Sequence, residues 1–151
     1  PAMLLVERGH SVSVSLSHKR QALKETDKVV LDGEPVTVPM QTSNAAVQAA
    51  FLQALDLVRQ PRASLYTLYQ AWLDTVVALQ AARVTGAFSL LDSAERAQQR
   101  REALHVSLTL QSQIVSLRSA AAKVSQIARQ VELNIELRRL QDELSVAKSK
   151  L

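Results

Sequence analysis

The spacing of apolar and polar residues changes along the chain, from a period of two in the first forty positions to a period of three or four afterwards. In SVSVSLSHK, Val12, Val14 and Leu16 alternate with serines, which predicts a strand with one buried face. The preceding AMLLVER is an almost continuous apolar run, which is typical of a strand covered on both faces. Gly9 lies between them and predicts a turn that pairs the two strands.

The segment KVVLDGEPVTVPM predicts two more short strands, joined by a hairpin turn at Asp32 and Gly33. Pro35 and Pro39 lack a backbone N–H, so the last strand is expected at an edge of the sheet. Residues 1–41 therefore predict a small antiparallel sheet of three or four strands. Because the chain enters a strand at PAMLLVERG without a lead-in, we expect this portion to be the end of a larger domain in a longer protein; removal of an initiator methionine before Pro1 is the alternative.

Residues 42–151 have the spacing of helices. A first helix is expected over 43–60, with Ser43 as its N-cap and Pro61 as its stop. A second helix is expected over 64–84, before Gly86. It carries aromatic residues at helical spacing, which more often belong to a core than to a stacking surface; these are Tyr66, Tyr69 and Trp72.

A third helix is expected to run unbroken over residues 93–150. Asp92 and Glu95 have the spacing of a capping box, and no glycine or proline follows. A first apolar seam with alternating steps of four and three occupies positions 110, 114, 117, 121, 124, 128, 131 and 135. A second seam, offset by two residues, consists of Leu133, Leu137, Leu140, Leu144, Ala147 and Leu151. Offset seams fit a coiled-coil-like helix that meets two partners in succession.

The second seam predicts a protein interface, because a row of exposed leucines marks a contact surface. No glycine or proline after position 86 provides a hinge on which the helix could fold back. We therefore expect the last turns to contact a second polypeptide, either another copy of this chain or a partner protein. The candidate interface residues are Leu133, Leu137, Leu140, Leu144 and Leu151.

Composition supports an α+β fold that is mostly helical. Apolar residues make up 47% of the chain and glycine and proline are rare, which favours long helices over disorder. The absence of cysteine excludes disulfides and thiolate chemistry. We find no apolar stretch of membrane-spanning length and no signal peptide, so a cytoplasmic protein is expected.

The sequence contains no recognisable catalytic, cofactor or metal site. Its three histidines share no ligand spacing, its three glycines form no phosphate loop, and no serine lies in a nucleophile elbow. One acidic cluster comprises Glu25, Asp27, Asp32 and Glu34, with Lys24 and Lys28 nearby. It resembles those of metal-dependent nucleases but lacks their E-x-K pattern, and a solvated loop is the preferred interpretation. The chain itself is therefore expected not to be an enzyme and to have no small-molecule substrate.

The net charge of +4 arises entirely within residues 43–131, which fits either a polyanion-binding surface or a solvated helix face. The basic HKR at the end of the second strand could contact phosphate, or it could simply mark a strand emerging into water. No aromatic residue interleaves with the basic clusters, which disfavours base stacking and leaves duplex backbone contact open. The candidate nucleic-acid contacts are His18, Lys19, Arg20, Arg96, Arg100 and Arg101.

Two stretches, PAMLLVERGHSVSVSLSHKRQ and RQVELNIELRRLQDEL, resemble a bacterial family known as domain-of-unknown-function family 4391. His18, Lys19 and Arg20 match its basic strand end, and residues 131–137 match its closing motif. The resemblance covers the whole chain and implies an α/β portion upstream. It also implies a gene often found beside helicases and DNA methyltransferases in restriction-like or phage-defence clusters.

These observations lead to three expectations for function. The first is a non-catalytic accessory or adaptor subunit of such a defence complex, which binds the helicase, the methyltransferase or a second copy of itself through its long helix. The second is a module that binds the backbone of duplex DNA through HKR and the basic helices. The third is a fragment of a metal-dependent nuclease whose site lies mainly upstream.

Overall fold

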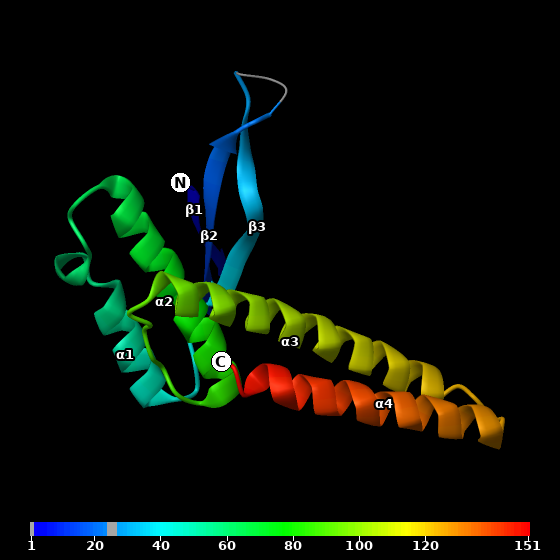
Figure 1. The fold of residues 1–151 in the computed structure, drawn as a ribbon. Helices are drawn as coiled ribbons and strands as arrows, with labels where there is room; N and C mark the ends of the chain where they lie inside the picture. Colours follow the sequence, from blue (N-terminus) through cyan, green and yellow to red (C-terminus); the bar gives the residue numbers. More distant parts are fainter. Residues whose placement is uncertain (1, 24–26) are drawn as a thin grey trace. The chain divides into compact units, whose positions relative to one another are not determined.

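The structure is a computed structural model of the chain that describes residues 2–23 and 27–151, without the side chains of Ala2 and Gly33. These residues form a small sheet and four α-helices, which are labelled in Figure 1. More than half of the residues are helical, so the expected α+β, mostly helical fold is confirmed. In chain order the elements are β1 (Ala2–Arg8), β2 (Ser11–Gln21), β3 (Val29–Pro39), α1 (Ala45–Leu55), a 3₁₀ turn (Leu57–Arg59), α2 (Leu65–Thr85), α3 (Ala94–Ala121) and α4 (Ile127–Lys148).

The chain divides into two compact units, residues 1–91 and residues 92–151. The sheet shares the first unit with α1 and α2. The physical reason is that one face of the sheet is apolar and is covered by α2, which packs on β2 and β3.

The sheet is antiparallel with the order β1-β2-β3, which puts β2 in the centre. Gly9 has a φ of 62° and forms the tight turn that pairs β1 with β2, as predicted. The predicted alternation of β2 is also confirmed, because Val14 and Leu16 are buried and Val12 is half-buried. On the opposite face Ser15 is hydrogen-bonded to Thr37 of β3.

Two expectations for the sheet are wrong. β3 is one strand that continues through Asp32, and the chain turns earlier, where the amide of Ala22 donates to the carbonyl of Lys28 at 2.8 Å. The reason is that β2 has eleven residues and pairs with both halves of β3 across a shift in register. β1 is an edge strand whose central side chains are exposed instead of covered on both faces; these are Met3, Leu4, Leu5 and Val6.

The core of the first unit lies between the sheet and the two helices. β2 and β3 contribute Val14, Leu16 and Val38, and α1 contributes Val47 and Phe51. The remaining members come from one side of α2 and are Tyr69, Leu73, Val76, Leu79 and Ala82. This single cluster fixes α2 across the sheet and thereby positions the aromatic residues of its first two turns.

The helix ends in this unit follow their capping residues. α1 is shorter than expected and is capped by Asn44, whose Oδ1 accepts from the amides of Ala46 and Val47. Ser43 is therefore not the cap, and the chain leaves the helix at Asp56, which caps the 3₁₀ turn instead. α2 agrees with its prediction, since it begins after a Ser64 capping box and ends at a left-handed Gly86.

The second unit is a helical hairpin, and the prediction of one helix over 93–150 is wrong. α3 and α4 lie side by side and antiparallel (Figure 1). The chain reverses over residues 122–126 without glycine, proline or any positive φ. Gln126, the N-cap of α4, has extended backbone (φ −76°, ψ 118°), and Gln130 Nε2 donates to the carbonyl of Val124 at 2.6 Å. α3 is capped by Ser93 and not by Asp92.

Within the described ranges, 2–23 and 27–151, none of the helices combines the length and apolarity that crossing a membrane requires.

Candidate functional site

The leucine seam predicted as an interface lies inside the helical hairpin. Leu133 and Leu140 are each only 7% exposed, and Leu137, Leu144 and Leu151 are partly buried. Four members of the seam pack with the α3 residues Leu110, Ile114 and Leu117; they are Leu137, Leu140, Leu144 and Ala147. The chain therefore covers these leucines itself, and their pattern no longer requires a second polypeptide. The sequence argument failed because it treated glycine or proline as necessary for the reversal.

A different apolar row is exposed on α4. Ile127, Val131 and Ile135 are 78%, 52% and 66% exposed, and they follow one another at steps of four residues. Val131 lies nine residues before the buried Leu140, which is about two and a half helical turns. It therefore points away from α3. We call these three residues the outer α4 stripe; Val131 and Ile135 also belong to the first seam of the sequence.

Positive charge lies close to the outer α4 stripe in sequence. Arg118 lies in the last turn of α3 and Lys123 lies in the turn that follows, and neither forms an ion pair with any residue that the structure describes. Arg129, near the start of α4, pairs with Glu132 at 2.7 Å. The turn end of the hairpin thus presents an apolar row with cations beside it.

The HKR strand end is built into the contact between β2 and α2. The His18 ring stacks on Tyr66 with 5.1 Å between ring centroids and meets the edge of Tyr69 at the same distance. His18 Nε2 donates to Gln70 Oε1 at 2.8 Å, and Gln70 Nε2 donates to Asp74 Oδ1 at 3.0 Å. This chain of hydrogen bonds fixes the imidazole plane.

The other two residues of HKR differ in their surroundings. Arg20 Nε lies 3.4 Å from Asp32 Oδ1, in a pair that is largely exposed. Arg20 follows His18 by two residues and therefore shares its face of β2, whereas Lys19 lies on the opposite face. Lys19 is exposed. Only Arg20 is thus positioned to act together with His18.

Tyr69 clamps the strand at the point where the register shifts. Its hydroxyl donates to the carbonyl of Ser17 and accepts from the amide of Ser17, both at 2.8 Å. Both residues are buried. We expect Tyr69→Phe to lower the free energy of unfolding by about 1–3 kcal/mol, because a buried amide loses its acceptor. Urea unfolding followed by circular dichroism measures this, and a Tyr66→Phe variant, which removes an exposed hydroxyl, should change stability by less than about 0.5 kcal/mol.

The three arginines predicted on the third helix do not form a common basic surface. Arg96 lies 3.9 Å from Asp92 in an exposed pair, and Arg101 donates to Gln98 Oε1 from Nε and Nη2. Arg100 is buried and its Nε donates to the backbone oxygen of Leu151 at 3.2 Å. Desolvation by burial lowers the pKa of the Arg100 guanidinium from its ordinary value. These contacts give Arg100 a structural role in joining the two ends of the hairpin.

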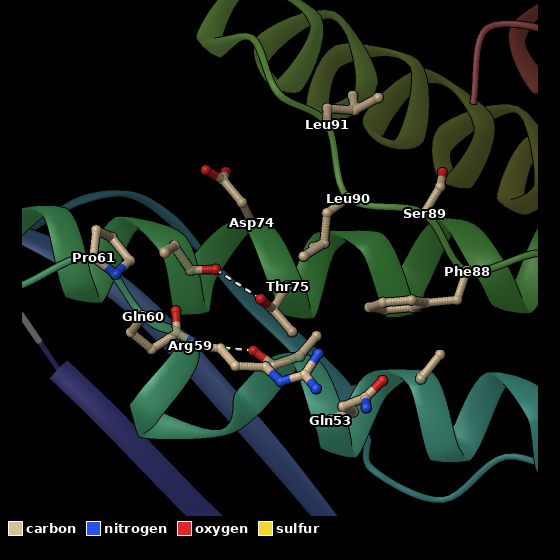
Figure 2. A pocket seen from close by; sticks show the side chains of 13 residues that line it. Gln53, Arg59, Gln60, Pro61, Asp74, Thr75, Phe88, Ser89, Leu90 and Leu91 are labelled. Atoms are coloured by element: carbon tan, nitrogen blue, oxygen red, sulfur yellow. Dashed lines mark hydrogen bonds between the residues drawn. The ribbon is translucent and has the colours of Figure 1, made fainter.

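A pocket of about 760 Å³ opens in the first unit between α1, α2 and the segment after α2. Figure 2 shows Arg59 and Gln53 on its wall, with Phe88 and Leu90 contributed by the later segment. The Arg59 guanidinium has no hydrogen-bond or ion-pair partner in the described part of the chain. The volume suits a small ligand. No histidine or cysteine is among its described lining residues.

The acidic cluster of the sequence does not form a metal site in the described residues, where no group of three or more metal-ligating side chains comes together. Asp27, Asp32 and Glu34 are exposed. Lys24 and Glu25 lie outside the described residues.

Comparison with known proteins agrees with the resemblance drawn from the sequence. No curated protein and no solved structure matches the chain significantly. The model of the family described as a domain of unknown function, DUF4391, matches residues 1–144. Since this match spans the sheet, α1, α2, α3 and most of α4, the chain belongs to the DUF4391 family.

Proposed function

We propose that this protein is a non-catalytic accessory subunit of a bacterial defence complex and that it binds a partner protein through the outer α4 stripe. The observation that carries the proposal is the exposure of Ile127, Val131 and Ile135 in one row on a helix whose opposite face is already packed. An exposed apolar row of this kind marks a contact surface.

The proposed contact lies on the C-terminal helix that the sequence indicated, but on the face of α4 opposite the leucine seam. The leucines of the second seam stabilise the hairpin, and the hairpin then presents the outer α4 stripe on a firm support. A preformed helix loses little conformational entropy when it binds, which favours affinity.

Charge indicates what kind of partner fits. Arg118 and Lys123 lie beside the turn that leads into the outer α4 stripe. We therefore propose an amphipathic helix that carries acidic residues next to its apolar face. The defence setting, with a helicase or DNA methyltransferase as the partner, is supported by the genomic neighbourhood that the family resemblance implies.

The duplex-DNA alternative is supported less well by these contacts. Of the six basic residues selected from the sequence, Arg100 is buried against the backbone of Leu151. Lys19 lies on the opposite face of β2 from His18 and Arg20, so HKR does not form one basic surface. The nuclease alternative receives no support from the described residues, which hold no metal-binding cluster.

The test is co-expression with the helicase or methyltransferase encoded beside the gene, followed by light scattering of the purified complex. We expect the Val131→Asp, Ile135→Asp double variant to weaken the complex at least about tenfold, because two buried apolar contacts are replaced by charges. Asn134→Asp and Gln141→Asp add the same charge at exposed polar positions of α4 and should bind like the wild type.

Circular dichroism of the double variant should retain the wild-type helix signal, since both positions are exposed. A complex that forms equally well with both double variants would contradict the proposal. Wild-type dimers that the Val131→Asp, Ile135→Asp variant converts to monomers would show instead that a second copy occupies the stripe.

A further inference from the structure

Tyr66, in the first turn of α2, is a largely exposed aromatic residue. It is 65% exposed, although Tyr69 and Trp72 of the same helix pack into or against the core. The interpretation of all three as core residues is therefore wrong for Tyr66. One face of its ring is stacked on His18, and most of the residue remains accessible to solvent.

We infer that Tyr66, His18 and Arg20 form a binding site for a nucleotide of a single-stranded nucleic acid, with the base stacked on Tyr66 and the phosphate bound by Arg20. Stacking of bases on aromatic side chains is the main sequence-independent contact in single-strand binding, and a nearby cation tracks the backbone. Both components are present here, on adjoining elements of one unit.

The aromatic component is rigid before any ligand arrives. His18 is fixed by Gln70, which is in turn fixed by Asp74, and the ring lies between Tyr66 and Tyr69. Its interplanar angle with Tyr66 is 29°, close to parallel. A base added to the open face of Tyr66 would extend this stack, and little side-chain freedom would be lost on binding.

The cationic component, Arg20, is the next residue after His18 on the same face of β2. Arg20 follows His18 at the spacing that puts both side chains on one side of β2, about 7 Å apart along the strand. Its ion pair with Asp32 is exposed on both sides, and such pairs are weak. A phosphate can therefore compete for the guanidinium, which binds phosphate with two N–H groups.

A single strand fits this site better than a duplex. In a duplex the base faces are covered by their neighbours, so Tyr66 could reach none of them without unstacking. The lack of aromatics within the basic clusters argued against stacking at the sequence level. The fold supplies the missing aromatic from α2, 48 positions after His18 in the numbering of the chain.

The site is tested with fluorescein-labelled twelve-residue oligothymidylate and oligoadenylate, titrated with the full chain and read by fluorescence anisotropy. Tyr66→Ala should weaken binding about tenfold, and Tyr66→Phe, which keeps the ring, should bind like the wild type. Arg20→Gln should weaken binding and reduce the slope of log K against log salt by about 0.7, the value for one lost phosphate contact.

Lys19→Gln is the matched control, because it removes the same charge from the neighbouring residue on the opposite face of β2. It should leave affinity within about twofold of the wild type. Circular dichroism should show that all four variants fold, since Lys19, Arg20 and Tyr66 are exposed.

Three results would overturn the inference: no binding of either oligonucleotide, wild-type affinity in Tyr66→Ala, or equal losses in Arg20→Gln and Lys19→Gln. Thymidine and adenosine monophosphates serve as competitors. Competition by the monophosphates at concentrations equal to those of the oligonucleotides would overturn the assignment to a strand, because a strand gains from contacts with successive nucleotides.

Discussion

Replacing Phe51 by alanine is expected to lower the free energy of unfolding of the first unit by about 3–5 kcal/mol. Phe51 is 0% exposed and is the largest of the fully buried side chains. It belongs to the cluster that joins α1, α2 and the sheet, and its ring meets the edge of Phe88 with 6.3 Å between centroids. Truncation removes apolar contacts on several elements at once and leaves a cavity that the sheet cannot fill by moving.

The measurement is urea unfolding followed by far-UV circular dichroism and by fluorescence of Trp72, which packs against the same cluster. Leu52→Ala is the matched control on the next position of α1, where the side chain is 51% exposed. Its effect should stay below about 1 kcal/mol. Equal losses in the two variants would show that α1 is not docked through Phe51.

The elements that the sequence predicted well are those whose signals are local. The alternation around Val14, the Gly9 turn and the ends of α2 at Ser64 and Gly86 each depend on residues within a few positions of one another. Local sterics and hydrogen bonding determine such features before tertiary packing contributes.

The predictions that are wrong concern features that depend on tertiary packing. Whether AMLLVER is covered depends on how far α2 reaches across the sheet, and α2 packs on β2 and β3. Whether the chain turns at Asp32 depends on how many residues of β2 are available to pair with β3. Neither the reach of α2 across the sheet nor the number of pairing residues in β2 can be predicted from the residues of β1 or β3 alone.

The offset between the two apolar seams did carry the information that the helix reverses. Leu110, Ile114 and Leu117 of the first seam pack against the second seam, so the two seams face one another in the hairpin. The last two members of the first seam, Val131 and Ile135, lie on the outer face of α4. A change of seam was interpreted as a change of partner, although the partner is the preceding part of the same chain.

The candidate site could be predicted only in part. The basic residues of HKR are visible in the sequence, but their neighbours on α2 are not, because Tyr66 and Gln70 come close only when α2 crosses the sheet. Sequence spacing likewise could not show that Arg100 is buried against the backbone of Leu151.

A pair of equal substitutions on α4 distinguishes the packed face of the hairpin from its outer face. Leu140 is 7% exposed and packs with Leu110 and Ile114, whereas Ile135, five residues earlier, is 66% exposed. Leu140→Asp places an unpaired carboxylate among apolar side chains, which costs several kcal/mol in addition to the lost packing. We expect it to lower the free energy of unfolding of the hairpin by at least about 3 kcal/mol, with a large loss of the helix signal at 222 nm.

Ile135→Asp makes a closely similar chemical change on the same helix but leaves the new charge in water, so its effect should stay within about 0.5 kcal/mol. Thermal unfolding of both variants by circular dichroism, with light scattering to record the mass, provides the comparison. If Ile135→Asp unfolded the chain while Leu140→Asp did not, the outer face would be the packed one, and the reversal at residues 122–126 would be wrong. The expected order instead assigns Leu140 to folding and leaves Ile135 available for a partner, which is the division of roles on which the proposed accessory function depends.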